Sequence, residues 1–187
     1  MDYPSNEPVL GRELNATQRT AIMAILTAST IATNYILIGV VNVKLMDLIV
    51  FTSGYLFGAW MGASVGALTW LVYGTLNPYG FSLPILGATV LGEALYGVAG
   101  GAVSNFWRPT NWRPDVRLAV AGFLLTFIYD IFTNVVSALT VGVPIAVSLV
   151  GGVPFALAHE ASNAAFFCLG FPPLATSISK VMEAYVK

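Results

Sequence analysis

The stretch QRTAIMAILTASTIATNYILIGVV, from Gln18 to Val41, carries a single charged residue, Arg19, at its second position. No further charged residue follows until Lys44. The uncharged run is long enough to cross a bilayer, because a transmembrane helix needs about 20 residues. We therefore expect a first membrane-spanning helix over about residues 18–40.

Three alanines, Ala24, Ala28 and Ala32, follow one another in this stretch with a spacing of four. On a helix they fall in one narrow row. A row of alanines gains little by facing lipid, but it allows another helix to approach closely. Two interpretations follow: the row packs within the chain's own helical bundle, or it docks a partner protein.

Composition places the whole chain in the membrane. Of its 187 residues, 57% are hydrophobic and 9% are charged, whereas a soluble domain carries about 25% charged residues. We expect one membrane domain over 1–187, with a polar tail at 1–17 that lacks the pattern of a cleavable signal. A net charge of −1 argues against nucleic-acid binding, and one cysteine, Cys168, excludes an intrachain disulfide and a cysteine metal cluster.

The lengths of the apolar stretches and the turn residues between them predict an all-α integral membrane protein with six transmembrane helices in one bundle. Asp47 suits the first turn of the second helix, and glycines at every fourth position from Gly54 to Gly66 permit tight packing of two short helices. The expected spans are about 18–40, 46–60, 62–76, 83–106, 116–140 and 153–171, with Val41–Lys44 as an extended connection.

The last span has an ambiguous start. The apolar stretch 144–170 fits one helix kinked at Pro154, or a short re-entrant piece followed by a helix from about Pro154. We favour the second interpretation, with a main span of about 153–171. The sequence Phe171-Pro172-Pro173 is expected to interrupt that helix and leave a short amphipathic tail.

Basic residues indicate the orientation, because cytoplasmic loops are enriched in lysine and arginine. With six spans, both termini lie on the same side of the membrane. That side carries seven basic residues, and the other side carries only Lys44. We therefore expect cytoplasmic termini in the cell membrane and outward connections at 41–46, 77–82 and 141–152. The seven are Arg12, Arg19, Arg108, Arg113, Arg117, Lys180 and Lys187.

Charged and amide side chains inside the expected spans are candidates for function, because such groups are costly in a membrane. Asp130 and Asn134 share a helix face, as do His159 and Asn163, and the topology puts both pairs at similar depth. The alternative is that these groups satisfy one another as contacts between helices. Our substrate-binding candidates are Lys44, Asn77, Tyr79, Glu93, Tyr96, Asp130, Asn134, His159 and Asn163.

Catalysis is not favoured by this set. His159-Glu160 begins a zinc motif of the H-E-x-x-H type, but Asn163 stands where the second histidine belongs and the chain has no other histidine. No phosphate-binding loop or serine nucleophile motif is present. We expect neither an enzyme nor a bound metal or cofactor, and ATP-driven transport would require another subunit to hydrolyse ATP.

The order of these features resembles the S components of energy-coupling factor (ECF) transporters. The resemblance rests on the alanine row, on Asn42-Val43-Lys44-Leu45-Met46-Asp47 leading into Gly54-Tyr55-Leu56-Phe57-Gly58, and on Pro154-Phe155 followed by His159-Glu160-Ala161-Ser162-Asn163. It covers nearly the whole chain. Many relatives carry a proline after the phenylalanine-glycine pair, where this chain has Ala59.

The resemblance implies a function. An S component captures a vitamin or similar micronutrient from outside and delivers it through a membrane coupling protein and two cytoplasmic ATPases. Ala24, Ala28 and Ala32 would contact the coupling protein, and the candidates above would bind the substrate. The alternative is a stand-alone ion- or proton-coupled transporter of a small polar solute, which the intramembrane acids Glu93, Asp130 and Glu160 suggest.

Overall fold

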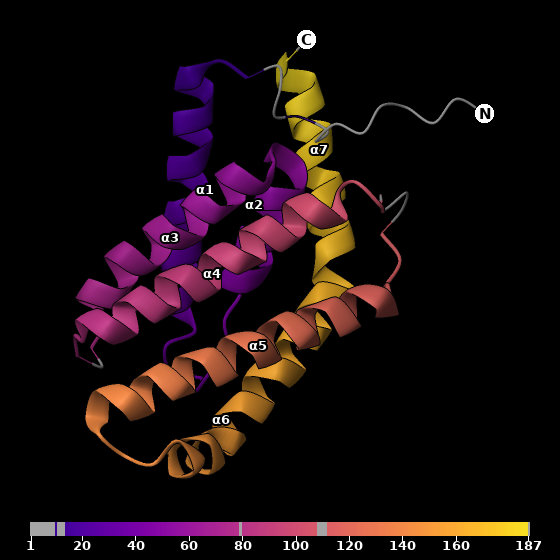
Figure 1. Ribbon diagram of the computed structural model, residues 1–187. Coiled ribbons are helices and arrows are strands. Elements are labelled where there is room, and N and C mark those ends of the chain that lie inside the picture. The colour runs from indigo at the N-terminus through magenta and orange to yellow at the C-terminus, as the bar shows by residue number, and fades with distance from the viewer. Residues whose placement is uncertain (1–9, 11–13, 79, 108–111, 187) are drawn as a thin grey trace.

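The computed structural model describes residues 10, 14–78, 80–107 and 112–186. These residues form helices and no strand (Figure 1). The helices are α1 (Ala16–Ile36), α2 (Met46–Phe57), α3 (Ala59–Leu76), α4 (Leu83–Val103), α5 (Val116–Val141), α6 (Ile145–Ala165), the π-helix η1 (Phe166–Gly170) and α7 (Phe171–Val186). The all-α prediction is thus confirmed for this part of the chain.

Helix α1 begins with a reciprocal cap. The Asn15 side chain accepts from the Gln18 backbone N–H at 2.9 Å, and the Gln18 side chain accepts from the Asn15 backbone N–H at 2.9 Å. The helix ends at Ile36, short of the expected residue 40. Val41 and Asn42 lie in a turn, where an extended connection over Val41–Lys44 was predicted, and Asn42 has a positive φ of 56°, a conformation that asparagine tolerates.

Helices α2 and α3 are joined through one residue, Gly58, whose φ of 99° suits glycine. The predicted very short link is therefore correct, although α2 ends at Phe57 and not near residue 60. Helix α2 lies at the centre of the molecule, and all its residues except Ile49 are buried.

Glycine permits the close packing of α2, α3 and α4. A Cβ on Gly54 would collide with the Gly97 carbonyl, and a Cβ on Gly97 would collide with the Gly62 backbone. The period-four glycines therefore serve packing, as expected. These glycines also contact α4, which runs alongside α3 (Figure 1). The sequence pattern predicted only the packing of α2 against α3.

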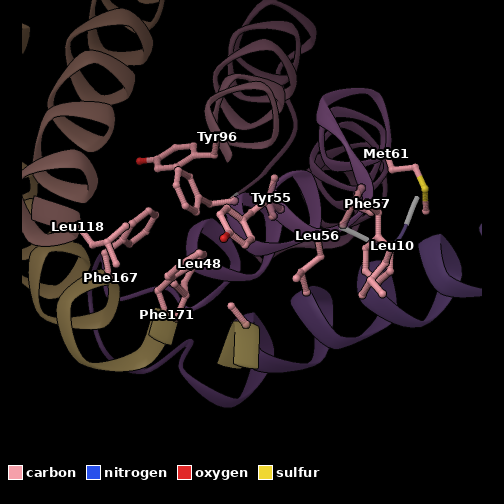
Figure 2. Packing of buried hydrophobic residues seen from close by; sticks show 14 of the residues in the cluster. Leu10, Leu48, Tyr55, Leu56, Phe57, Met61, Tyr96, Leu118, Phe167 and Phe171 are labelled. Atoms are coloured by element: carbon pink, nitrogen blue, oxygen red, sulfur yellow. The ribbon is translucent and has the colours of Figure 1, made fainter. Parts of the chain in front are cut away.

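The aromatic core lies between α2 and the helix that passes through η1. Phe51 packs against Phe167 and Phe171 with ring centroids 5.0 and 5.3 Å apart, and Tyr55 meets Phe171 at 5.0 Å. Figure 2 shows Phe167 and Phe171 beside Leu48 and Tyr55 in this cluster. Burial of these rings fixes the last helical segment against α2.

The last helical segment differs from the prediction in three respects. Helix α6 begins at Ile145, directly after Pro144, and not near residue 153; Pro154 lies inside it. The prolines after Phe171 do not interrupt the helical path, which continues through η1 into α7. Proline cannot donate to the carbonyl four residues earlier. Pro172 therefore leaves the Cys168 carbonyl without its usual helical donor. This carbonyl instead accepts from the Asp115 backbone N–H at 3.1 Å.

Within the described ranges, three helical segments are long and apolar enough to cross a membrane: Leu83–Val103, Val116–Val141 and Ile145–Met182. Helix α5 exposes Val120, Leu124 and Ile128, which are spaced by four and therefore form one apolar stripe. Such surfaces suit lipid contact and suggest insertion into a membrane. Helix α2 is apolar but shorter.

Candidate functional site

A buried polar cluster is centred on His159 of α6. Its Nε2 lies 2.8 Å from Asp47 Oδ2, and its Nδ1 lies 3.0 Å from Asp130 Oδ1. The exposed fractions are 1% for His159, 1% for Asp47 and 6% for Asp130. The imidazole therefore joins α2 to α5, and Asp130 and His159 are in direct contact.

Asn163, one turn further along α6, extends the cluster. Its Nδ2 donates to Asp47 Oδ2 at 2.6 Å and to Thr126 Oγ1 at 2.7 Å. Tyr96 of α4 donates its hydroxyl to the same Thr126 oxygen at 2.9 Å. Asp47, Asn163, Thr126 and Tyr96 thus tie four helices together through fully desolvated groups, which makes the arrangement specific.

Glu93, Trp70 and Lys44 form the other side of the cluster. Trp70 Nε1 donates to Glu93 Oε2 at 3.2 Å, and the Glu93 side chain is completely buried. The Lys44 ammonium lies 5.2 Å from the Trp70 ring centroid and 5.8 Å from that of Tyr129. Lys44 also interacts electrostatically with Asp47 and Glu93, so one cation lies beside the buried carboxyl groups.

A cavity of about 700 Å³ opens next to this cluster. It lies between the end of α1, the connection 37–44, the facing ends of α3 and α4, and Phe155 of α6. Aromatic and aliphatic side chains dominate its lining. This volume lies within the range of about 300–1,000 Å³ that is usual for small-molecule sites.

Lys44 and Trp70 belong to both features. Each lines the cavity, and each contacts or faces the buried carboxyl groups. The cavity and the polar cluster are therefore adjacent parts of one region, separated by these two side chains.

The sequence-predicted candidates divide between the two features. Lys44 and Asn77 line the cavity. The cluster contains Glu93, Tyr96, Asp130, His159 and Asn163. Asn134 is bound locally, donating to the Asp130 backbone carbonyl at 2.8 Å, and Tyr79 lies outside the described residues. Whether any of these residues binds a substrate stays a prediction.

Three contributors were missed from the sequence: Asp47, Thr126 and Trp70. Asp47 was assigned only to the dipole of α2, yet it accepts from His159 and Asn163. Thr126 was not singled out at all. The spacing of Asp47 from Lys44 was an available signal, because an acid and a lysine three residues apart at a helix entrance suggest a charged site.

The alanine row of α1 is exposed along its length: Ala24, Ala28 and Ala32 all face away from the rest of the described chain. Helix α1 instead packs through its opposite side, where Thr30 bonds Thr69 of α3 at 2.6 Å. Packing within the chain's own described helices therefore does not account for the row.

No group of three His, Cys, Asp or Glu side chains in the described ranges is placed to hold a metal ion. No family model matches this sequence, and comparison with curated proteins and with solved structures finds no match.

Proposed function

We propose that this chain is the substrate-binding S component of an ECF-type importer in the cell membrane. It captures a vitamin-like micronutrient and delivers it through a membrane coupling protein and two cytoplasmic ATPases. The observation that carries the proposal is the cavity of about 700 Å³ with its aromatic lining, which suits capture of a small solute. The chain itself is not the enzyme in this scheme.

The position of the cavity supports uptake from outside. The lining comes from the connections that charge bias assigns to the outer side, with Lys44, Asn77 and Phe81 among its residues. At the other end, Arg117 lies over Trp107 and Lys180 over Trp112, with 5.9 and 5.8 Å from the charged group to the ring centroid. Basic and tryptophan side chains together are typical of a cytoplasmic membrane interface. Six spans with both termini cytoplasmic belong to the same proposal.

The exposed alanine row supports a docking partner. Small side chains let another helix approach closely in a membrane, and Ala24, Ala28 and Ala32 are available for such contact. The cavity involves the far end of α1, so the docking row and the binding region are separate surfaces. One coupling protein could thus serve substrate-binding subunits of different specificity.

A decisive experiment co-expresses the chain with its candidate coupling protein and ATPases and measures ATP-dependent uptake of the solute that co-purifies with the chain. Ala28→Trp should abolish uptake and complex formation while leaving solute binding by the isolated chain unchanged, because the Ala28 side chain is exposed and does not line the cavity. Leu124→Trp is the matched control: it adds a tryptophan to an exposed position of α5 and should transport normally.

Normal transport by Ala28→Trp would refute the docking assignment. Failure of the chain to bind any solute or to associate with a coupling protein would refute the S-component proposal as a whole.

A second candidate is a stand-alone ion- or proton-coupled transporter. The observation favouring it is the imidazole of His159 between two buried carboxyl groups, because such chains of titratable groups serve as proton relays in membranes. This function predicts gradient-dependent uptake by the purified chain in liposomes without any ATPase. Uptake only with ATPases present would exclude it.

A further inference from the structure

The Lys44 side chain lines the cavity, and its ammonium group has no hydrogen-bond acceptor in the described part of the chain. Its close contacts are the rings of Trp70 and Tyr129, whose centroids lie 5.2 and 5.8 Å from Nζ. It forms neither a hydrogen bond nor an ion pair with a described residue. The three N–H donors of this ammonium therefore remain available.

The Lys44 ammonium is open to the cavity and is not sealed inside the fold. Within the described ranges, four polar side-chain atoms are both fully enclosed and without a partner, and Lys44 Nζ is not one of them. Because Nζ lacks an acceptor as well, it retains surface that is open to solvent. The side chain is otherwise partly buried, and the cavity is the open space that it lines. A ligand in the cavity can therefore approach this nitrogen.

The two acids near Lys44 have other hydrogen-bond partners. Asp47 Oδ2 accepts from His159 and Asn163, and Glu93 Oε2 accepts from the Trp70 indole. Both acids interact with Lys44 electrostatically but form no ion pair with it. An acceptor for the ammonium must therefore come from outside the described chain.

The charge of the lining favours a ligand with a single negative charge. Of the described residues that line the cavity, Lys44 alone is charged, and a hydrogen bond between charged partners is about twice as strong as one between neutral groups. The ammonium repels a cationic ligand. A phosphate monoester would leave one of its two negative charges unpaired in apolar surroundings, and Asp47 and Glu93 would repel it. A carboxylate matches the one cation without either cost.

The rest of the lining favours an apolar ligand body. Val41, Phe81 and Phe155 line the cavity, and each side chain is more than half exposed. Covering such surface contributes about 25 cal/mol per Å². A small anion such as acetate would reach Lys44 but leave these side chains uncovered, so the carboxylate is expected on a larger apolar solute.

We propose that the cavity binds an organic monocarboxylate with an apolar body. The carboxylate accepts from the Lys44 ammonium, and the body lies against the aromatic and aliphatic lining. Lys44 thereby determines the specificity for an anionic solute. The inference rests on the proposed function for the use of the cavity, and it adds the chemical class of the substrate.

The test measures binding of four probes to the purified full-length chain in detergent at neutral pH by calorimetry, with titration into detergent alone as the blank. Cinnamate carries a carboxylate on an apolar body, and cinnamamide is its neutral counterpart of nearly equal shape. Cinnamyl phosphate is a dianion, and acetate lacks the body. Cinnamate should bind about tenfold more tightly than cinnamamide, as expected when a neutral acceptor replaces a charged one, and more tightly than the other two probes.

Variants of Lys44 locate the recognition. Lys44→Met keeps an apolar stem but removes the charge, and it should abolish the preference for cinnamate over cinnamamide while cinnamamide affinity stays within about twofold. Lys44→Arg restores the charge and should keep most of the preference. Lys180→Met is the matched control, because Lys180 also lies over a tryptophan ring, 5.8 Å from the Trp112 centroid, but does not line the cavity. It should keep the full preference.

Equal or tighter binding of any other probe, or no binding of cinnamate, would overturn the inference. A folded Lys44→Met variant that keeps the preference would also overturn it. If Lys44→Met does not fold, the four probes on the wild-type chain decide the class of ligand, and Lys44→Arg decides the role of the charge. These outcomes are distinct from failure of the proposed function, which is tested by Ala28→Trp and by the need for ATPases in uptake.

Discussion

His159 Nε2 and Asp47 Oδ2 lie 2.8 Å apart although 112 residues separate them in the chain. Since the other imidazole nitrogen faces Asp130, one side chain connects the start of α2 with the middles of α5 and α6. The Tyr129 ring meets the imidazole edge to face with centroids 5.8 Å apart. His159 is thus held on several sides by contacts that only this packing provides.

Replacement of His159 by alanine should lower the free energy of unfolding by about 3–5 kcal/mol, because it leaves buried carboxyl groups without their partner. The measurement is the denaturant midpoint of the detergent-solubilised chain. Ser162→Ala on the same helix is the control: it removes a bond to a backbone carbonyl within the helix and should change stability by no more than about 0.5 kcal/mol. Equal effects of the two changes would contradict a structural role for the imidazole.

Gly97→Ala should destabilise the fold by about 3 kcal/mol or more, because the added Cβ would collide with the Gly62 backbone and force α3 and α4 apart. Gly87→Ala tests the same substitution in the same helix where nothing lies within 4 Å of the added atom. It should be neutral or stabilise by about 0.5–1 kcal/mol. Thermal unfolding of both variants in detergent gives the comparison, and a neutral Gly97→Ala would refute the close packing.

Trp70→Phe should cost about 1–3 kcal/mol, because the Glu93 carboxyl group loses its indole donor while it stays buried. Trp60→Phe makes the same change at a side chain that is 82% exposed and should leave the unfolding midpoint unaltered. Trp70 also lines the cavity. Quenching of tryptophan fluorescence by a bound solute should therefore decrease in Trp70→Phe and persist in Trp60→Phe.

Asp115 caps α5 by accepting from the Arg117 backbone N–H at 2.9 Å. The Asp115→Ala change should cost about 0.5–2 kcal/mol, whereas Asp115→Asn should retain most of the cap. The Arg117 side-chain hydrogen bond lowers the pKa of Asp115 below its ordinary value of 3.8. Its contribution is therefore present above pH 3.8 and is lost as the pH falls through the lower pKa of the folded state.

A pH series of unfolding midpoints checks this sign. The wild-type chain should lose stability relative to Asp115→Asn as the pH falls below about 4, because the amide does not titrate. A stability advantage of the wild type over Asp115→Asn that stays constant or shrinks as the pH rises through that window would contradict the assigned ion pair.

Local sequence signals predicted most helices but not the course of the last segment. The end predicted for the fifth span at about residue 140 is correct, since α5 ends at Val141 before Gly142. The interruption predicted at Phe171-Pro172-Pro173 is wrong, because the Cys168 carbonyl finds a donor in the Asp115 backbone N–H. The rule for proline assumes that the freed carbonyl has no partner, and here a distant part of the chain provides one.

The residues of the candidate site were also predicted only in part. Residue type and spacing identified Asp130, His159 and Asn163, because charged and amide groups stand out in an apolar helix. The role of Asp47 depended on which helix packed against its first turn. Trp70 became informative only when its hydrogen bond to the Glu93 carboxyl group was known.

By itself, the sequence determined the helical class, the apolar character and the small-residue positions, because these follow from local composition and period. Only the tertiary structure decided that the alanine row is exposed, that α2 is buried at the centre, and that the buried acids share His159. Such relations can join residues far apart in the chain, as His159 and Asp47 are, with 112 positions between them. They are set by packing between helices, which no local pattern encodes.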